Sequence, residues 1–398
     1  MKVKHDDGAL TLYLAGRIDA NNAAEVESEI SAELAKFPGE APTFDASGLE
    51  YISSAGLRVL LKFRKQFNKK LDVLNVSGEV YDIFEVTGFT ELLNVKKRLR
   101  EISVEGLEVI GGGSFSTVYR LDPETIVKVF THPTATLAGA ESDQKISREV
   151  FLHDIPTAIP YDVVKAGEHY GLVYEMIDAD TVSGTLRKHP ERLEELSRKM
   201  ARLMKKLHTT EFTPGTFPDM KDIMHKWMTF PFDKGIITAE DKALIDGLID
   251  RVPYRNTFVH PDYHPKNVMV SNDELVLIDV GDSGLGHPIF GLMITYAHLV
   301  FFTRTGGERT RKMHEQIMNL DTESLEAMWA FMMQEYFGTT DTETLKHYEE
   351  VISGYVPIFV LVGASTGPIP KEKLPELTAP IVERFRKVIP TLKPIEGI

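Results

Sequence analysis

Asp262, Asn267 and Asp279 carry side-chain oxygens at the ends of two short apolar runs late in the chain. Asn267 opens the first run, which extends to Val270, and Asp279 directly follows the second run, residues 275–278. The turn-forming Ser-Asn-Asp segment between the runs predicts a β-hairpin, whose pairing would bring the three side chains to one edge. Phosphoryl transfer needs two carboxylates and an amide oxygen placed close together in this way. One carboxylate accepts the proton of the attacking hydroxyl, and a carboxylate and an amide oxygen hold Mg²⁺ against the phosphates.

This segment also carries a family resemblance. The spacing His260-x-Asp262-x-x-x-x-Asn267, followed after the hairpin by Asp279, resembles the catalytic loop and metal-binding Asp of kinase-fold enzymes. Its His-Pro-Lys-Asn form is closer to the aminoglycoside and choline kinase branch than to eukaryotic protein kinases. The resemblance implies that Asp262 is the catalytic base and that Asn267 and Asp279 bind magnesium. Two positions where the branch often has Gly differ here, without loss of a functional group: Pro261 and Lys266.

An ordinary hairpin with capping Asp and Asn residues could have the same sequence. A glycine-rich strand pair upstream argues against this alternative, because it contains the nucleotide-binding residues that the resemblance implies. Gly111, Gly113 and Ser114 lie in the turn between two predicted strands, and the chain then returns as a third strand that carries Lys128. Glycines let backbone amides approach phosphates, and a lysine supplies a point charge for the α- and β-phosphates of ATP. Alone, this pattern is equally well explained as a tight hairpin. Ser116 stands at the third glycine position, which would loosen the phosphate lid without abolishing it.

A lysine in this role needs an acidic partner that holds its position. Residues 142–153 have a helical pattern, and Glu149 lies on the face expected to look back at Lys128. Glu141 and Asp143 are the alternative partners on the same segment. We therefore expect Glu149 to position Lys128.

Residues 170–177 predict a buried strand that ends in a polar turn. They resemble the hinge between the lobes of a kinase fold, and the resemblance implies that backbone groups from Glu175 to Ile177 bind the adenine ring. No side chain identifies this contact. Beyond Asp279 the chain leads directly to a helix, with no long activation segment, which favours the small-molecule branch over protein kinases.

The composition limits the classes of function. The 398 residues exceed one typical core, which suggests about two or three domains. A net charge of −14 argues against a nucleic-acid partner, and the absence of cysteine excludes disulfides, thiolate catalysis and cysteine-ligated metal. The longest apolar stretch, residues 288–302, is interrupted by polar residues and is shorter than the roughly 20 residues that span a bilayer. We therefore expect a buried helix there, no membrane partner and a cytoplasmic location.

Residues 1–98 alternate between strand and helix patterns. Residues 10–14 alternate apolar with polar side chains, the period of a half-buried strand, whereas residues 26–34 repeat at helical spacing. The patterns that follow predict, in order, a strand at 43–46, a helix at 55–68, a strand at 71–76 and a helix at 79–86. Such alternation implies a small sheet covered by helices, which is an α/β fold.

Residues 44–61 add a specific signature, Phe-Asp-Ala-Ser-Gly-Leu-Glu-Tyr-Ile-Ser-Ser-Ala-Gly-Leu-Arg-Val-Leu-Leu. Leu-Ala-Gly-Arg-Ile-Asp precedes it at 14–19, and Glu-Val-Thr-Gly-Phe follows it at 85–89. Together these segments are similar to STAS domains, the fold of bacterial anti-sigma factor antagonists. The resemblance implies a domain that binds a protein partner.

In many STAS domains a serine or threonine at the start of this helix is phosphorylated, which releases the partner. Free backbone N–H groups at a helix N-terminus tolerate the added charge. Family members often carry Asp-Ser-Ser-Gly or Asp-Ser-Thr-Gly, whereas this chain has Ser53-Ser54-Ala55-Gly56. Ser54 is therefore the first candidate for phosphorylation and Ser53 the second. Alternatively, both serines are N-cap residues that satisfy the free amides.

The predicted organisation is an α/β STAS-like domain at 1–98, a short basic linker at 99–103 and an α+β bilobal protein-kinase-like domain. Its N-lobe would span 104–178 and its helical C-lobe 179–398. Acceptor selectivity is expected in the later helices, because substrate pockets in this branch are built from the C-lobe. Acidic side chains there would suit a cationic acceptor or form a solvated face: Glu323, Glu326, Glu335, Asp341 and Glu343.

The sequence thus predicts ATP-dependent transfer of a γ-phosphoryl group to the hydroxyl of a small molecule, with magnesium as cofactor and a regulatory partner-binding domain. Two alternatives use the same residues. One is a non-enzymatic nucleotide sensor in a sigma-factor-type partner-switching pathway, and the other is a kinase that acts on a protein serine. His264 and His287, which stand beside turns, are typical of hydrogen-bonded structural groups rather than metal ligands.

Overall fold

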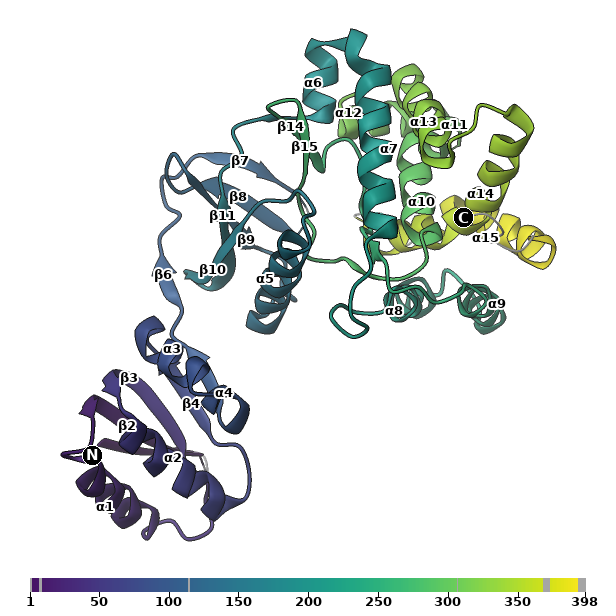
Figure 1. Cartoon of the computed structure of the whole chain (residues 1–398). Coiled ribbons are helices and arrows are strands. Elements are labelled where there is room, and N and C mark those ends of the chain that lie inside the picture. Colours follow the sequence, from purple (N-terminus) through teal and green to yellow (C-terminus); the bar gives the residue numbers. More distant parts are fainter. Residues whose placement is uncertain (1, 7–8, 114, 306, 368–372, 393–398) are drawn as a thin grey trace. The chain divides into compact units, whose positions relative to one another are not determined.

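The computed structural model describes residues 2–6, 9–113, 115–305, 307–367 and 373–392. The chain divides into two compact units (Figure 1). The first contains residues 1–103 together with 164–168, and the second contains 104–163 and 169–398. Each unit has its own hydrophobic core. Among the helices that lie in the described ranges, none combines the length and the apolar character needed to cross a bilayer.

The first unit is a five-stranded sheet in the order β1-β2-β3-β4-β5, in which only β1 runs antiparallel to its neighbour. The strands are β1 Lys2–Asp6, β2 Ala9–Ile18, β3 Thr43–Ile52, β4 Asp72–Val76 and β5 Asn94–Lys97. The helices are α1 Ala23–Leu34, α2 Ser54–Phe67, α3 Gly78–Val86 and α4 Phe89–Leu92. The predicted α/β fold is confirmed. Strands β1 and β5 were not predicted, because both are short and largely exposed and lack the apolar alternation that marks a half-buried strand.

Helix α2 starts where the sequence provides a cap and a small residue. The Ser53 Oγ accepts the backbone N–H groups of Ala55 (3.1 Å) and Gly56 (3.4 Å), two amides that a helix start leaves without partners. A Cβ at Gly56 would lie 2.7 Å from Ile52 Cγ1 and 2.8 Å from Ile18 Cγ2, so only glycine lets the helix approach β2 and β3 this closely. The Ser-Ser-Ala-Gly segment is therefore shaped by packing as well as by capping.

The second unit begins with an antiparallel sheet. Its strands are β7 Val109–Gly112, β8 Ser116–Arg120, β9 Thr125–Phe130, β11 His169–Glu175 and the first part of β10 Pro160–Ala166, whose residues 164–166 belong to the first unit. The full sheet order is β6-β10-β11-β9-β8-β7. Strand β6, Arg100–Ile102, occupies most of the predicted linker and pairs in parallel with residues 164–166 of β10. Figure 1 shows helix α5, Leu137–Leu152, beside this sheet.

The remaining part of the second unit is mostly helical, as predicted. Its helices are α6 Val182–Lys188, α7 Leu193–Thr209, α8 Met220–Asp233, α9 Ala239–Asp250, α10 Ile289–Tyr296, α11 Phe302–Arg304, α12 Gly307–Met318, α13 Thr322–Phe337, α14 Thr342–Thr366 and α15 Leu374–Val388. Three short strands accompany them: β12 Asp180–Thr181, β13 Phe258–Val259 and β16 Gly284–Leu285. The apolar stretch that follows Pro288 forms a buried helix, as predicted, but residues 297–301 inside it form a π-helical turn between α10 and α11.

The predicted hairpin is present as β14, Val268–Ser271, paired with β15, Glu274–Leu277. Its two turn residues, Asn272 (φ 50°) and Asp273 (φ 67°), both have left-handed backbone conformations, which is the signature of a tight hairpin turn. The Asp273 carboxylate also pairs with Arg192 (2.5 Å) and Lys199 (2.7 Å), so the tip of the hairpin is fixed against α7.

Candidate active site

The hairpin places Asp262 and Asn267 together at one edge. The Asn267 Nδ2 group donates to Asp262 Oδ2 and to the Asp262 carbonyl, both at 2.9 Å. Across the hairpin, the Ile278 N–H donates to the Asn267 carbonyl (3.0 Å), so Asp279 begins directly beside Asn267. Asp279 itself has φ 61°, a left-handed conformation that a non-glycine residue adopts only when its surroundings hold it there.

Lys128 joins the sheet to this edge through two ion pairs. Its Nζ lies 3.1 Å from Asp143 Oδ2 on α5 and 2.5 Å from Asp279 Oδ1. Burial alone would lower the pKa of Lys128, but the charges of Asp143 and Asp279 outweigh burial and raise it above its ordinary value. The lysine is therefore charged at neutral pH and stands between the two carboxylates.

Asp143 is held by a buried hydrogen-bond network. Its Oδ1 accepts the hydroxyls of Tyr174 (2.9 Å) and Ser147 (3.2 Å), while its Oδ2 faces Lys128. Gly281 packs against the same carboxyl group, because a Cβ there would lie 2.1 Å from Asp143 Cγ. The loop that follows Asp279 thus fits over a carboxylate whose orientation is already fixed.

The prediction that Glu149 positions Lys128 is wrong, and Asp143 does so instead. Asp143 lies on the buried face of α5 and is 7% exposed, whereas Glu149 lies nearly two turns further along at a partly exposed position. Six residues correspond to about 240° of rotation around a helix. The two carboxylates therefore point to different sides of α5, and only Asp143 faces β9.

The glycine-rich turn lies between β7 and β8, as predicted from the pattern. The Gly113 N–H donates to the Ser116 carbonyl (2.9 Å), and a Cβ at Gly112 would lie 3.1 Å from that same oxygen. Gly111 faces Val118 across the strand pair, whereas the space around a Cβ at Gly113 is open. Ser114, the remaining predicted phosphate-binding position, lies outside the described residues.

The predicted hinge follows β11. The N–H groups of Glu175 and Met176 donate to the carbonyls of Ile159 (3.0 Å) and Glu124 (2.7 Å), so both are used inside the unit. Ile177 packs against a small apolar cluster that contains Leu172 and Tyr174. A flat apolar ligand could contact this cluster, but the amides of Glu175 and Met176 are already engaged.

Asp262 lies between two imidazole rings. Its Oδ2 is 3.3 Å from His264 Nε2, and its Oδ1 is 3.3 Å from His298 Nε2 in the π-helical turn. Burial would raise the pKa of Asp262, but the interactions with His264 and His298 outweigh it and hold the pKa well below its ordinary value. Sequence reasoning missed His298, because it stands within an apolar stretch and no motif links it to the catalytic loop.

The donor set at the hairpin edge fits magnesium. Asn267 uses its Nδ2 group on Asp262, which leaves its amide oxygen available as a ligand. The Asp279 side chain is 49% exposed, with one oxygen on Lys128. A carboxylate and an amide oxygen are the hard donors that Mg²⁺ prefers, with water and phosphate oxygens completing its coordination.

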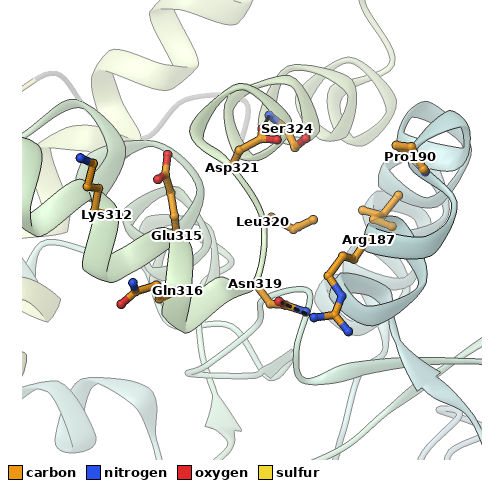
Figure 2. Close-up of a pocket in the computed structure, with 10 residues that line it drawn as sticks. Arg187, Pro190, Lys312, Glu315, Gln316, Asn319, Leu320, Asp321 and Ser324 are labelled. Atoms are coloured by element: carbon orange, nitrogen blue, oxygen red, sulfur yellow. Dashed lines mark hydrogen bonds between the residues drawn. The ribbon is translucent and has the colours of Figure 1, made fainter.

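A surface groove of about 530 Å³ lies elsewhere in the second unit, between α6, α12 and the start of α13 (Figure 2). Arg187 donates to the Asn319 side chain across it at 3.4 Å. Its lining contains none of the phosphotransfer candidates. The groove is open and its charged side chains are mixed in sign, so the hairpin edge remains the candidate active site.

Three of the acidic side chains that were weighed as a wall for a cationic acceptor have structural partners: Glu326, Glu335 and Asp341. Glu326 pairs with Arg304 (3.0 Å) and Glu335 with Arg202 (2.9 Å). Asp341 accepts the Thr344 N–H at the start of α14. These contacts favour the alternative of a solvated and paired helix face.

The two candidate phosphorylation sites differ in the first unit. Ser53 is the N-cap of α2, with its hydroxyl oxygen engaged by two amides. Ser54 is the first helical residue, and its side chain is exposed. The alternative in which both serines are caps therefore holds for Ser53 alone.

Sequence comparisons give the same division of the chain. The family model described as the phosphotransferase enzyme family matches residues 106–328, more than half of the chain, and the STAS domain model matches residues 1–102. The candidate anti-sigma factor antagonist BtrV of Bordetella bronchiseptica is 37% identical over 101 residues, which are 24% of this chain and 85% of that protein. The anti-sigma-B factor antagonist of Listeria monocytogenes is 26% identical over 96 residues, 23% of this chain and 83% of that protein.

Similar solved structures include ADP-bound aminoglycoside phosphotransferase APH(2'')-Ib, with 16% identity, coverage of 76% of this chain and 98% of that chain, and a TM-score of 0.47. A choline/ethanolamine kinase family protein from Mesorhizobium loti has 13% identity, coverage of 74% and 90%, and a TM-score of 0.43. The family assignment depends on the sequence models and not on these distant likenesses. The chain belongs to the phosphotransferase enzyme family and carries a STAS domain ahead of its phosphotransferase region.

Proposed function

We propose that the second unit transfers the γ-phosphoryl group of ATP to a hydroxyl of a small molecule. The observation that carries this proposal is the convergence of Asp262, Asn267, Lys128 and Asp279 around one hairpin edge. A proton acceptor, two oxygen ligands and a fixed cation are the parts that phosphoryl transfer requires, and their positions in the fold match their roles.

In this mechanism Asp262 orients the acceptor hydroxyl and takes its proton as the hydroxyl oxygen attacks the γ-phosphorus. The bond from that phosphorus to the bridging oxygen breaks, ADP leaves with the bonding electrons, and the proton passes from Asp262 to solvent. Asn267 fixes the Asp262 carboxylate through its Nδ2–H bond. The products are a phosphate ester and ADP.

Lys128 would bind the α- and β-phosphates, and Asp143 would keep it in place. Asn267 and Asp279 would hold Mg²⁺, which neutralises charge on the phosphates when bound. Gly111, Gly113 and Ser114, in the glycine-rich turn, would cover the phosphates. For the adenine ring we assign the carbonyl of Glu175 and the amide of Ile177, since the amides of Glu175 and Met176 are engaged within the unit.

The first unit, with residues 1–98 as its proposed domain boundary, would regulate this activity by binding a protein partner. Its relatives are named as anti-sigma factor antagonists, and that name implies a protein partner. We propose a protein partner for this chain as well. Ser54 is the proposed switch, because it is exposed at the start of α2, where the helix dipole favours an added negative charge. Cytoplasmic location follows from the proposed ATP and partner chemistry.

Incubation of the purified full chain with Mg-ATP tests the enzymatic half. ADP release that depends on an added mixture of hydroxyl-bearing metabolites, and that Asp262→Asn abolishes, is the expected result. A phosphate found by mass spectrometry on a serine of the chain would instead favour a protein kinase. Saturable ATP binding with neither ADP nor a phosphorylated product would contradict phosphotransfer and favour a nucleotide sensor.

The regulatory half is tested by Ser54→Asp, with Ser47→Asp as the matched control. Both serines are exposed, but Ser47 lies within β3 and donates its N–H to Asp45 (2.8 Å), away from the start of α2. Ser54→Asp should change partner capture or ATP turnover, and Ser47→Asp should change neither. Wild-type behaviour in both variants would leave the first unit without a phosphorylation switch.

A further inference from the structure

His298 approaches the catalytic carboxylate from a helix that no catalytic motif includes. Its Nε2 lies 3.3 Å from Asp262 Oδ1, while His264 Nε2 lies at the same distance from Oδ2. The two histidine side chains are 12% and 10% exposed, and the Asp262 side chain is 47% exposed. The carboxylate is therefore enclosed by imidazole on two sides and open on the remaining side.

The backbone decides the tautomer of His264. The Lys266 N–H donates to His264 Nδ1 at 3.2 Å, so that nitrogen carries the lone pair. In a neutral imidazole the proton must then lie on Nε2, the atom that faces Asp262. His264 is thus an N–H donor to the carboxylate.

The surroundings of His298 lead to the same assignment. Both of its ring nitrogens are buried and lack a well-formed hydrogen bond within the described part of the chain. Its Nε2 faces a carboxylate, which only accepts, so the proton belongs on Nε2. The ring is held by His314, stacked at 5.9 Å, and by Phe359, edge-on at 5.2 Å. The 3.3 Å contact is long, as catalytic hydrogen bonds often are before substrate binds.

A metal ion is a poorer occupant of this cluster. One ligand atom from each of Asp262, His264 and His298 lies within 4.8 Å of the others, which resembles a metal site in outline. A histidine that binds metal through Nε2 carries its proton on Nδ1 and usually donates it to an acceptor. Here the Nδ1 of His264 receives an N–H, and the Nδ1 of His298 has no hydrogen-bond partner among the described residues. The cluster fits hydrogen-bond donors better than ligands.

The π-helical turn explains how His298 reaches this position. A π turn contains an extra residue, which widens the helix and changes the direction of its side chains. Residues 297–301 form this turn between α10 and α11, and the His298 carbonyl accepts the His314 Nε2–H from α12 at 2.6 Å. His298 therefore connects the helices around α12 to the base.

We propose that His298 is a positioning residue, whose Nε2–H bond to Asp262 Oδ1 orients the base toward the acceptor hydroxyl. This role rests on the proposed phosphotransfer, because it assumes that Asp262 acts on a hydroxyl. His264 and Asn267 hold the other carboxylate oxygen, Oδ2. Without His298 the carboxylate could rotate about its remaining contacts, so the acceptor would meet a misdirected base while nucleotide binding stayed unchanged.

Kinetics and NMR of the full chain test this proposal. His298→Phe keeps the aromatic wall and removes the donor, and His298→Gln restores an N–H group. With Mg-ATP and the mixture of hydroxyl-bearing metabolites as acceptor, His298→Phe should lower kcat for ADP release roughly 10- to 100-fold, as expected for losing a hydrogen bond to a charged group, with KM for ATP unchanged. His298→Gln should recover part of the loss. The control His225→Phe, which removes another imidazole that contacts a carboxylate (Asp246, 2.8 Å), should leave kcat unchanged.

Nitrogen-15 NMR of the histidine side chains reports the contact without any turnover. His264 and His298 should both be Nε2–H tautomers, and the His298 signals should shift in Asp262→Ala. Unchanged kcat in His298→Phe, an Nδ1–H tautomer at His298, or stoichiometric Zn²⁺ binding that both His298→Phe and His264→Phe abolish would overturn the proposal. If the wild-type chain releases no ADP with any acceptor in the mixture, the proposed function fails, and the NMR result alone then decides whether His298 holds Asp262.

Discussion

At the residue scale, the proposed mechanism assigns Asp262 to the acceptor and Lys128 to the nucleotide. Asp262 accepts a hydrogen bond from Asn267 and lies 3.3 Å from His264 and His298, whereas Lys128 pairs with Asp143 and Asp279. The two groups share no direct contact among these interactions. Substitutions at each should therefore have separable effects on transfer and on nucleotide binding.

Asp262→Asn should keep ATP affinity and slow phosphoryl transfer by roughly 10²- to 10⁴-fold, the range for loss of a positioned base. The amide cannot take the hydroxyl proton, but it can still accept the Asn267 N–H bond. Calorimetry with Mg-ATP and single-turnover measurement of transfer check the two halves. Wild-type turnover in this variant would remove Asp262 from the mechanism.

Asp143→Asn should weaken ATP binding, because Lys128 loses one of its two carboxylates and is drawn toward Asp279 alone. We expect an increase in Kd of roughly 10-fold or more, since the pair is buried. Glu149→Gln is the matched control on the same helix and should bind ATP as the wild type does. A larger effect at Glu149 than at Asp143 would restore the assignment made from the sequence.

The arrangement at the hairpin edge could be predicted from the sequence, but the partner of Lys128 could not, and the reason is geometric. Asp262, Asn267 and Asp279 are brought together by a hairpin that local pairing rules predict. The partner on α5 depends on which face of that helix meets β9, and Asp143, Glu141 and Glu149 are all compatible with a helical pattern. The position of His298 is even harder to predict from the sequence. A π turn sets the direction of its side chain, and hydrophobic periodicity does not reveal a π turn.

At the element scale, secondary structure followed local patterns where an element was long and half-buried. Strand β2 and helices α1, α2 and α5 lie where the sequence predicted strand or helix. The missed strands β1, β5 and β6 are three to five residues long and mostly exposed, so sheet pairing and not their own sequence makes them strands. Residues 100–102 of the predicted linker form β6 for this reason.

Ser53→Ala should destabilise the first unit by roughly 0.5–2 kcal/mol, because two amides at the start of α2 lose their acceptor. Ser54→Ala, one residue later and exposed, should change stability by less than about 0.5 kcal/mol. Hydrogen exchange of peptides from residues 54–67, followed by mass spectrometry, measures the difference. Equal protection in the two variants would contradict the capping assignment.

At the scale of the whole molecule, the two units should respond differently to acid. The second unit contains several buried histidines, among them His208, His287 and His314. Burial lowers the pKa of His208 to about 3, and lowers those of His287 and His314 to about 4, from an ordinary value of 6.5. The first unit contains a single histidine, His5, which is paired with Glu40 near the surface.

The folded-state pKa of each buried histidine is below its unfolded-state value, so the unfolded chain takes up protons first as the pH falls. Stability of the second unit should be complete above pH 6.5 and should decline as the pH falls from 6.5 toward about 4. One pKa unit corresponds to about 1.4 kcal/mol, so each histidine contributes on the order of 3–5 kcal/mol once the pH is below its folded-state pKa, and about 2 kcal/mol at pH 5.

Urea unfolding at pH 7.5 and pH 5 measures this loss. Trp227 and Trp329 both lie in the second unit, so fluorescence reports that unit alone. The tryptophan midpoint should fall at pH 5, while hydrogen exchange in the first unit changes little. Replacement of His208 by Gln should reduce the pH dependence, and an unaltered dependence would exclude that histidine as a contributor.

Because Gly281 packs against Asp143, the substitutions that are tolerated at one of these two positions depend on the residue at the other. A library that samples every amino acid should retain glycine alone at 281, because even one methyl group would meet a carboxylate that Lys128, Ser147 and Tyr174 hold in place. Gly113, with open space around its Cβ position, should tolerate small side chains. Alanine at 281 becomes sterically acceptable only after Asp143 is replaced by a smaller residue. That replacement removes the carboxylate partner of Lys128. Positions 143 and 281 are therefore expected to change together in evolution or not at all.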